Sequence, residues 1–324
     1  MTASPHPGPA GPAGSGPLDS TAQLMNQIST RLSARLGRLG PGTARRPPTL
    51  VAVAHGSRDP RALRTVTALL DRVRALRPDL PVRLGHIEID RPLLPETLAG
   101  LRGEAVLVPL LLSRGYHVKH DLPAMAAAAL AADRPARAAA PAGATGPAGA
   151  TAPRPAAVPG ARSPGARLTL RTARPLGPHP LLAEALHARL VEAGWRTPAA
   201  AGAGVVLAAA GSRDPDSALD TARTAALLSR RLGGIPVLPG YAGGAGPTVD
   251  GAVRALGAHG RPRPAVASCF VAPGRFSAQC AAAAPGVAAD PLGDHPALAR
   301  LVLHRYTEAL ATAPIAPEAV TVAV

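Results

Sequence analysis

The chain of 324 residues is long enough for two domains of ordinary size, and it is rich in proline and glycine but poor in aromatic residues, which make up 2% of it. Its formal net charge of +15 suits a polyanionic partner, but the arginines are scattered and few aromatics stand among them, which argues against a nucleic-acid-binding surface. Cys269 and Cys280 fit neither a disulfide framework nor a four-ligand zinc site, and no uninterrupted apolar stretch is long enough to span a membrane.

Residues 1–48 have the composition of a tail. The segment opens with proline, glycine, alanine and serine, and its one helical signal is an apolar residue at every fourth position within 21–39. It has too few large apolar residues to fold alone. It also lacks a positively charged region followed by an apolar one, so no secretory signal is indicated and we expect the protein in the cytoplasm.

A regular alternation of strands and helices begins at Thr49. The apolar run Leu50–Ala54 predicts a buried strand, and the helical periodicity that follows predicts a helix from Pro60 to Arg77. Further along we expect strands at Val82–Ile87, Ala105–Leu112 and Leu168–Leu170, and helices at Leu94–Leu101, from Val118 or Leu122 to Ala132, and from Pro180 to Ala193. This order favours a right-handed parallel α/β sheet.

The first strand and its loop recur in the second half of the chain. Val205 begins a copy in which Gly211 lies 155 residues after Gly56, whereas the two Pro-Leu-Gly elements, at Pro175 and Pro291, are 116 residues apart. The difference of 39 residues indicates an insertion inside the first half, where 134–165 consist mainly of alanine, proline, glycine and arginine. That stretch is therefore interpreted as an inserted loop rather than a linker between domains.

The duplication predicts two similar doubly wound, flavodoxin-like α/β domains. We expect a tail at 1–48, a first domain at 49–197 with its insertion at 134–165, a second domain at 202–312 and a tail at 313–324. The elements expected in the second domain are Val205–Ala209, Asp216–Leu232, Pro236–Leu238, Val249–Leu256, Ala265–Cys269, a short helix after Arg275, and a helix after the Pro291 element that ends at Leu310.

Three polar residues stand at the carboxyl ends of successive strands of the first half. His55 follows the first strand, Glu88 the second and His117 the third. Loops that leave the same edge of a parallel sheet converge, so two imidazoles and a carboxylate are expected in one cleft, a set that suits a divalent transition metal. Taken singly, each has an ordinary structural alternative: a hydrogen-bonded histidine at a strand end, or a glutamate that caps a helix or pairs with an arginine.

The second half retains the scaffold and loses all three groups. Alignment places Ala210 at the position of His55, Gly243 at that of Glu88 and Phe276 at that of His117. Joint loss is the pattern expected of residues that serve one site. His86 and His120 are weaker candidates for supporting groups, and His179 and His295, which recur in both Pro-Leu-Gly elements, are predicted to be structural residues at helix starts.

At this point the chain resembles the sirohydrochlorin chelatases of the CbiX/SirB type, relatives of class II cobalt and iron chelatases. The resemblance rests on Val53-Ala-His-Gly-Ser-Arg-Asp-Pro60, on Glu88 with Arg91-Pro92, on Ser113-Arg-Gly-Tyr-His-Val-Lys-His-Asp-Leu-Pro123, and on the duplicated Pro-Leu-Gly element. It covers 49–133 and 167–312. It implies the two-domain chelatase fold and insertion of Fe²⁺ or Co²⁺ into a cyclic tetrapyrrole at one site per chain, in the half that retains the histidines.

The resemblance also implies roles for individual residues. His55, His117 and Glu88 would form the metal site, with Glu88 as a supporting ligand or proton acceptor. Side chains around the cleft would bind the carboxylates of sirohydrochlorin, and the candidates are Ser57, Arg58, Arg61, Arg91, Ser113, Arg114 and Lys119. No permanently bound cofactor, nucleic acid or membrane partner is expected.

The choice of metal stays open at this stage. Fe²⁺ for siroheme is preferred, and Co²⁺ for cobalamin synthesis is the alternative, because the same ligand set accepts both ions. From another class, a non-catalytic carrier of tetrapyrrole or metal would use the same cleft. The oligomeric state is not indicated by the sequence.

Overall fold

The computed structural model describes residues 46–133, 167–196, 202–244 and 246–316. The elements of the first half are β1 Thr49–Ala54, α2 Pro60–Leu76, β2 Val82–His86, α3 Leu94–Ala99, β3 Glu104–Pro109, the π-helix η1 His117–Asp121, α4 Leu122–Ala132, β4 Thr169–Thr172 and α5 Pro180–Glu192. Those of the second half are β5 Val205–Ala209, α6 Pro215–Arg231, β6 Val237–Tyr241, α7 Val249–Ala258, β7 Ala265–Ser268, α8 Arg275–Ala282 and α9 Pro296–Leu310. All of them belong to one compact unit, which begins at Pro47.

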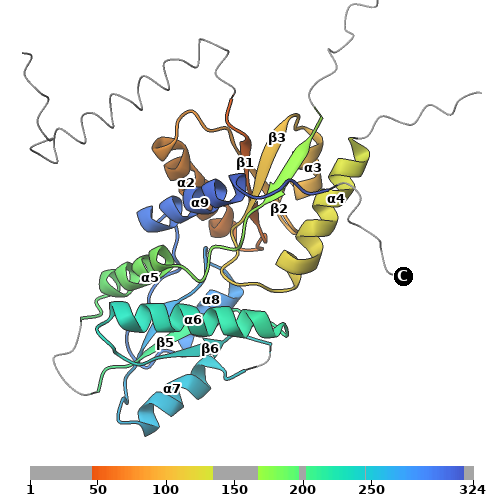
Figure 1. Ribbon diagram of the computed structural model, residues 1–324. Helices are drawn as coiled ribbons and strands as arrows, with labels where there is room; N and C mark the ends of the chain where they lie inside the picture. Colours follow the sequence, from red (N-terminus) through yellow and green to blue (C-terminus); the bar gives the residue numbers. More distant parts are fainter. Residues whose placement is uncertain (1–45, 134–166, 197–201, 245, 317–324) are drawn as a thin grey trace, which may run out of the picture. The chain divides into compact units, whose positions relative to one another are not determined.

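Two parallel sheets form the centre of the two halves (Figure 1), which confirms the predicted α/β class with duplicated parallel sheets. The first sheet has the order β2-β1-β3-β4 and the second β6-β5-β7, so in each the first strand of the half lies between the next two. The side chains of Leu50 to Val53 in β1 are fully buried, as is typical of a central strand covered on both faces by helices. β4 pairs with β3, so residues 134–166 lie between two elements of the same sheet.

The second sheet has a reduced edge where the first has β4. In the described part of this half, a single bridge between Val266 and Ala288 is formed there, with hydrogen bonds from Val266 N to Val287 O and from Ala289 N to Val266 O. The helix expected within 21–39 and the insertion expected at 134–165 lie outside the described residues. The predicted domain boundaries stay predictions.

The last helix of each half packs on the other half. α5 contacts α6 and β7 of the second half, whereas α9 contacts α2, β3 and β4 of the first, and the two exchanged helices also contact each other (Figure 1). Both helices carry apolar residues that are fully buried, among them Leu186 and Leu190 in α5 and Leu301 and Val302 in α9. Because each sheet is covered in part by the other half's helix, the two halves share one hydrophobic core.

Two arginines of the exchanged helices hold the Pro-Leu-Gly loops. Arg305 of α9 donates from Nη2 to the carbonyls of Leu176 and Pro178, at 3.0 and 3.2 Å, and is only 2% exposed. Arg189 of α5 donates from Nε and Nη2 to the carbonyl of Leu292, at 3.0 and 2.8 Å. The repeated loop thus has an internal partner in each half, which gives the motif a structural role.

The histidines of the Pro-Leu-Gly elements cap the exchanged helices. His179 Nδ1 accepts from Leu181 N and His295 Nδ1 from Ala297 N, each at 3.1 Å, which gives the residues the helix-start role that the sequence predicted. A ring nitrogen can accept only while it is unprotonated. Burial, assisted by the charge of Arg305, lowers the pKa of His179 to about 4, and burial also lowers the pKa of His295.

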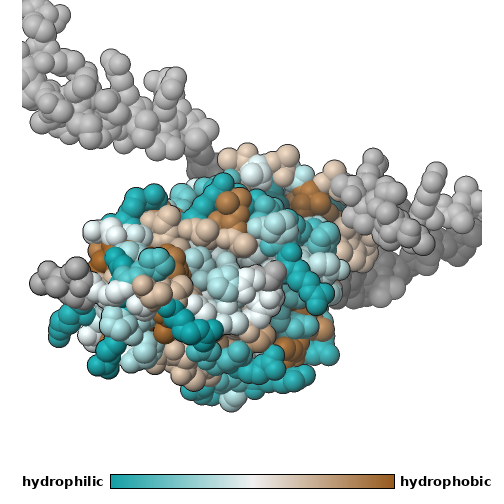
Figure 2. All heavy atoms as spheres, turned by 90° about the horizontal axis from the view of Figure 1, so that it is seen from below, coloured by the Kyte–Doolittle hydropathy of each residue, from teal (hydrophilic) through white to brown (hydrophobic). Residues whose placement is uncertain are grey.

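None of the described helices combines the length and apolar character that a membrane span requires. On the face seen in Figure 2, the described residues form no continuous apolar area; hydrophilic and apolar side chains alternate over it. Cys269 and Cys280 are buried free thiols, and burial raises their pKa values to about 12 and about 11.

The cap histidines predict a specific loss of stability in mild acid. In the unfolded chain they take up a proton near pH 6.5, whereas folded His179 resists protonation down to about pH 4, so its contribution is complete above pH 6.5 and is lost as the pH falls from there toward 4. We expect about 1 kcal/mol from His179, with allowance for its partial exposure.

The measurement compares thermal unfolding at pH 7 and pH 5 for the wild type and for the double variant His179→Asn/His295→Asn. Asparagine is a good N-cap that does not titrate in this range, so the variant should lose less stability on acidification. An equal loss in both proteins would contradict this role of the two imidazoles.

Candidate metal-binding site

The structure brings His55, Glu88 and His117 together at the carboxyl edge of the first sheet. His55 directly follows β1, Glu88 lies two residues after β2, and His117 opens η1 after β3. The Nε2 atoms of the two histidines are 3.1 Å apart, and Nε2 of His55 is 3.5 Å from Oε1 of Glu88. Parallel strand pairing explains the meeting, because β1 lies between β2 and β3.

The second ring nitrogen of each histidine has an acceptor beside it. Nδ1 of His117 is 2.6 Å from the carboxylate of Asp121, and Nδ1 of His55 is 3.1 Å from the carbonyl oxygen of Gly56. A carbonyl oxygen and an ionised carboxylate can only accept, so both Nδ1 atoms are assigned the hydrogen. With the hydrogens on Nδ1, the Nε2 atom of each neutral ring is left with a lone pair that can bind a proton or a metal ion.

The separation of the two Nε2 atoms suits a shared metal ligand pair. Two nitrogens that each lie about 2.1 Å from one ion, with an angle of about 90–110° between them, are about 3.0–3.4 Å apart. The side chains of His55, His117 and Glu88 are 42%, 36% and 52% exposed, so the site is open to solvent. Among the described residues no three His, Cys, Asp or Glu side chains form a group that could hold a metal ion, so the site offers a pair of imidazole nitrogens with Glu88 beside it.

The loop after β1 is shaped by Gly56. Its φ of +103° favours glycine, and a side chain there would collide with the backbone carbonyl of Glu88. The amide of Glu88 donates to the carbonyl of His55 at 3.0 Å, and the amide of Ser57 donates to the carboxylate of Asp90, also at 3.0 Å. These bonds tie the His55 loop to the Glu88 loop and thereby set the spacing of the two side chains.

A π-turn that carries His117 precedes the α-helix, which begins at Leu122, one of the two starts that the sequence predicted. η1 spans His117–Asp121, and α4 continues from Leu122. π-Turns are rare and are frequently found at functional sites. Here the turn contains both His117 and its partner Asp121.

The second half of the chain holds the His117 loop in place. Arg114 donates from its amide and from Nε and Nη2 to the carboxylate of Asp220, at 2.9, 2.9 and 2.6 Å, and its Nη1 is 3.2 Å from Asp216. Lys119 Nζ is 2.8 Å from carboxylate oxygens of both Asp214 and Asp216. All three carboxylates lie at or near the start of α6.

The side chains predicted to bind substrate carboxylates therefore differ in whether they are already paired within the protein. Arg114 and Lys119 are engaged with α6, and Ser113 Oγ is 3.0 Å from Ser217 Oγ of the same helix. Arg61 pairs with Asp59, Arg91 with Glu96, and Ser57 Oγ accepts from the amide of Asp59. Arg58 is exposed and has no ion-pair partner among the described residues.

The corresponding positions of the second half have the same backbone and no metal ligands. The amide of Gly243 donates to the carbonyl of Ala210 as that of Glu88 does to His55, and Gly211 has a φ of +87°. Phe276 stands in α8 where His117 stands in η1, and it is partly exposed. The alignment of the two halves is thus reproduced in three dimensions, and the ligand set occurs once in the described chain.

Residues outside the predicted set support the site. Asp121 and Asp90 were missed by sequence analysis, although the four-residue spacing of His117 and Asp121 is one that places helical side chains together. Of the weaker candidates, His86 is buried, with Nδ1 3.1 Å from the carbonyl of Pro92, and exposed His120 stacks on Tyr116. Neither contacts His55 or His117 in the interactions described.

Comparisons with known proteins agree with this architecture. The sirohydrochlorin cobaltochelatase of Methanosarcina acetivorans is 33% identical over 78 residues, which are 23% of this chain and 60% of that protein, so the chain spans about 60% of the length of this curated relative. The structure of SirB from Bacillus subtilis with Fe³⁺ superposes with a TM-score of 0.59 at 21% identity, over 82% of this chain and 96% of that one.

A second solved structure shows the same fold. The sirohydrochlorin chelatase SirB from Bacillus subtilis subspecies spizizenii in complex with cobalt has a TM-score of 0.56 at 19% identity, over 81% of this chain and 94% of that one. The sequence model of the family CbiX matches residues 49–193 and 204–309, which together cover most of the chain. The chain therefore belongs to the CbiX family.

Proposed function

We propose that this chain is a sirohydrochlorin chelatase, which inserts Fe²⁺ or Co²⁺ into the tetrapyrrole. The observation that carries the proposal is the pair of Nε2 atoms that lie 3.1 Å apart, with both Nδ1 atoms beside acceptors. Such a pair binds a divalent ion through two nitrogens and leaves its other positions open. An ion held this loosely can be passed on, whereas a closed four-ligand site retains its metal.

Metal insertion also requires a proton acceptor. The ion gives up its water ligands as two pyrrole N–H groups of the macrocycle lose their protons, so the products are the metallated ring and two protons. Glu88, 3.5 Å from Nε2 of His55 and about half exposed, is placed to accept one of them and pass it to solvent. Each imidazole can accept a proton at Nε2 once the ion has left it.

The arginines divide into two groups in this proposal. Arg58 and Arg91 lie on the loops of the site and Arg61 lies in the first turn of α2. All three are exposed, so they are assigned to the carboxylates of sirohydrochlorin, with Ser57 and Ser113 as further donors. Arg114 and Lys119 are assigned to holding the His117 loop against α6, because their charges are paired with Asp214, Asp216 and Asp220.

The ligand set alone does not select between Fe²⁺ and Co²⁺, so the inserted ion has to be identified by measurement. Two imidazoles and a carboxylate accept both Fe²⁺ and Co²⁺. The Methanosarcina relative is named a cobaltochelatase, and the SirB structures contain Fe³⁺ or cobalt. The preference for Fe²⁺ and the cytoplasmic location stay predictions from the sequence.

The proposal is tested by anaerobic incubation of the protein with sirohydrochlorin and either ion, followed by absorbance. The wild type should accelerate insertion well above the spontaneous rate, and His55→Ala and His117→Ala should each lower that rate by about a hundredfold or more. His120→Ala is the matched control, since His120 is exposed and stacks on Tyr116, and it should retain most of the rate. Binding of sirohydrochlorin without accelerated insertion of either ion would contradict the proposed enzyme and indicate a non-catalytic carrier.

The contact between Asp121 and His117 predicts a graded effect. Asp121→Asn removes the charged acceptor that keeps the hydrogen on Nδ1, so the insertion rate should fall by about 10–100-fold while the fold is preserved. Asp121→Glu keeps the charge and should be the milder change. The rates are compared at saturating metal, and a wild-type rate in Asp121→Asn would show that the carboxylate does not orient His117.

The assignment of Arg58 to the substrate and of Lys119 to α6 predicts different effects when each is substituted. Arg58→Gln should raise the KM for sirohydrochlorin by about tenfold with little change in the unfolding temperature, because one charged hydrogen bond to substrate is lost. Lys119→Met should instead lower the unfolding temperature measurably and change KM less, because its partners are in α6. Steady-state kinetics and thermal unfolding of both variants decide, and the reverse pattern would overturn the division.

A further inference from the structure

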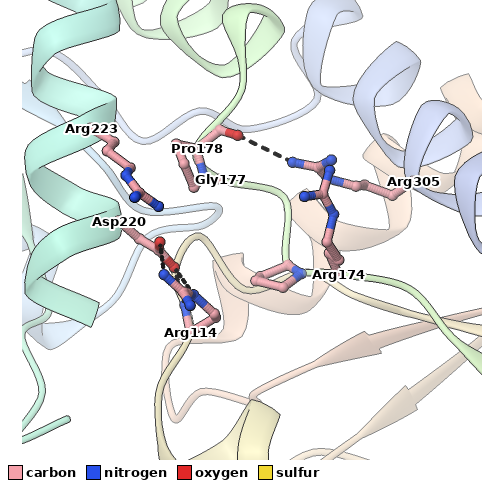
Figure 3. A pocket seen from close by; sticks show the side chains of 8 residues that line it. Arg114, Arg174, Gly177, Pro178, Asp220, Arg223 and Arg305 are labelled. Carbon is pink, nitrogen blue, oxygen red and sulfur yellow. Dashed lines mark hydrogen bonds and ion pairs between the residues drawn. The ribbon is translucent and has the colours of Figure 1, made fainter. Parts of the chain in front are cut away.

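A second polar cavity lies where the loop after β4, helix α6 and helix α9 meet. It has a volume of about 230 Å³ and is lined by the side chains of Arg114, Arg174, Asp220, Arg223 and Arg305 and by the Gly177–Pro178 backbone. Figure 3 shows Arg223, Asp220 and Arg114 on one side of it and Arg174 and Arg305 on the other. The His55–His117 pair is not part of its lining.

The four arginines are not fully neutralised by their neighbours. Arg114 pairs with Asp220 and Asp216, while Arg174 and Arg305 share Glu308. Among the described residues, Arg223 has no ion-pair partner, and it is exposed. These contacts join three carboxylates to three guanidinium groups, so the positive charge of Arg223 remains.

Hydrogen-bond donors are also left over. Arg174 uses only Nη2, toward Glu308 at 3.2 Å, and Arg223 donates to no group among the described residues. The Nε of buried Arg305 has no partner within the described part of the chain, whereas Nε of Arg189, its counterpart in α5, donates to Leu292 O. The cavity thus combines excess charge with spare donors from two sides.

Because the fold is duplicated, this cavity can be compared with its counterpart in the other half. A cavity of about 510 Å³ lies at the corresponding place, between α2, α5 and the second Pro-Leu-Gly loop. Arg189 and Gly293 occupy there the places of Arg305 and Gly177. The alignment of the halves, however, puts Pro273, Asp290 and Ala68 where the first cavity has Arg114, Arg174 and Arg223.

The two cavities differ in which arginines they contain, and the difference shows which of them the shared loop requires. In each half one arginine holds the loop, buried Arg305 in the first cavity and half-buried Arg189 in the second, and the second loop forms without the other three arginines. Arg174 and Arg223 are moreover exposed and contribute little to packing. Two arginines that project into a small cavity without a structural partner for each donor are the arrangement that binds an oxyanion by paired N–H···O bonds.

We propose that this cavity is an oxyanion-binding site, which holds a phosphate-sized anion or a carboxylate group between Arg174 and Arg223, with the Arg305 guanidinium behind them. A cation would be repelled by the excess positive charge. The cavity is too small for a tetrapyrrole ring, so a ligand enters as a free small anion or by a single acidic arm. The site is tested with phosphate alone and stands independently of the proposed chelatase activity.

The experiment titrates the full chain with inorganic phosphate by isothermal calorimetry, at constant ionic strength set with chloride. One phosphate should bind per chain, and Arg174→Gln and Arg223→Gln should each weaken it by about tenfold or more. Arg64→Gln is the matched control, because it removes an exposed arginine from the corresponding cavity, and it should leave the affinity unchanged. Thermal unfolding without phosphate confirms that the variants are folded.

The outcomes are distinct. No phosphate binding by the folded wild type, or equal weakening by Arg64→Gln, would overturn the site, because the second result is that of unspecific surface charge. If binding follows the predicted pattern, sirohydrochlorin is added to the phosphate-loaded protein. Displacement of phosphate assigns the site to a carboxylate arm of the tetrapyrrole, and simultaneous binding assigns it to a free small anion.

Discussion

The meeting of two imidazole Nε2 atoms is the constraint on which the rest of the site depends. At 3.1 Å, two neutral rings with hydrogen on Nδ1 place two acceptor nitrogens side by side, and a proton or a metal ion shared by both makes the arrangement favourable. Asp121 and the Gly56 carbonyl keep the hydrogens on the far side of the rings. The pair is thus prepared for a cation by its hydrogen bonds.

The backbone around the two histidines also fixes their positions. Gly56 allows the chain after β1 to approach Glu88, the Ser57 amide binds Asp90, and the π-turn places His117 and Asp121 on one short segment. Arg114 and Lys119 then fasten that segment to α6 of the other half. The second half, which lacks the two histidines, therefore supports the site by holding the His117 segment through the carboxylates of α6.

The duplication explains how one scaffold carries different chemistry in its two halves. Exchange of α5 and α9 makes each sheet depend on the other half for part of its core, and Arg189 and Arg305 hold the two Pro-Leu-Gly loops in the same way. These features occur in both halves. The His55–His117 pair and the arginines 114, 174 and 223 occur in one, so they are additions to the scaffold rather than requirements of it.

Much of this architecture could be predicted from the sequence because it depends on local patterns. Continuous apolar runs such as Leu50–Ala54 indicated the central strands, and the alignment of Gly56 with Gly211 indicated that the first strand and its loop are repeated in the second half. Because loops that follow parallel strands leave the same edge of a sheet, His55, Glu88 and His117 could be expected together without knowledge of the strand order.

Other features depend on tertiary contacts that a local pattern does not contain. The exchange of α5 and α9 leaves the periodicity of both helices unchanged, so nothing in the sequence distinguishes it from packing within each half. Arg114 and Lys119 were expected to bind substrate because cations near a cleft suit a polyanion, but their partners Asp214, Asp216 and Asp220 are about a hundred residues away in the chain. An arginine's partner is set by the fold.

The central claim is that His55 and His117 together hold one ion per chain. It is tested most directly by X-ray absorption of the protein loaded anaerobically with Co²⁺, with the metal content measured in parallel. We predict one ion per chain with two imidazole nitrogens at about 2.1 Å and oxygen ligands completing the coordination. A spectrum with no imidazole scattering, or one that is unchanged in His55→Ala, would contradict it.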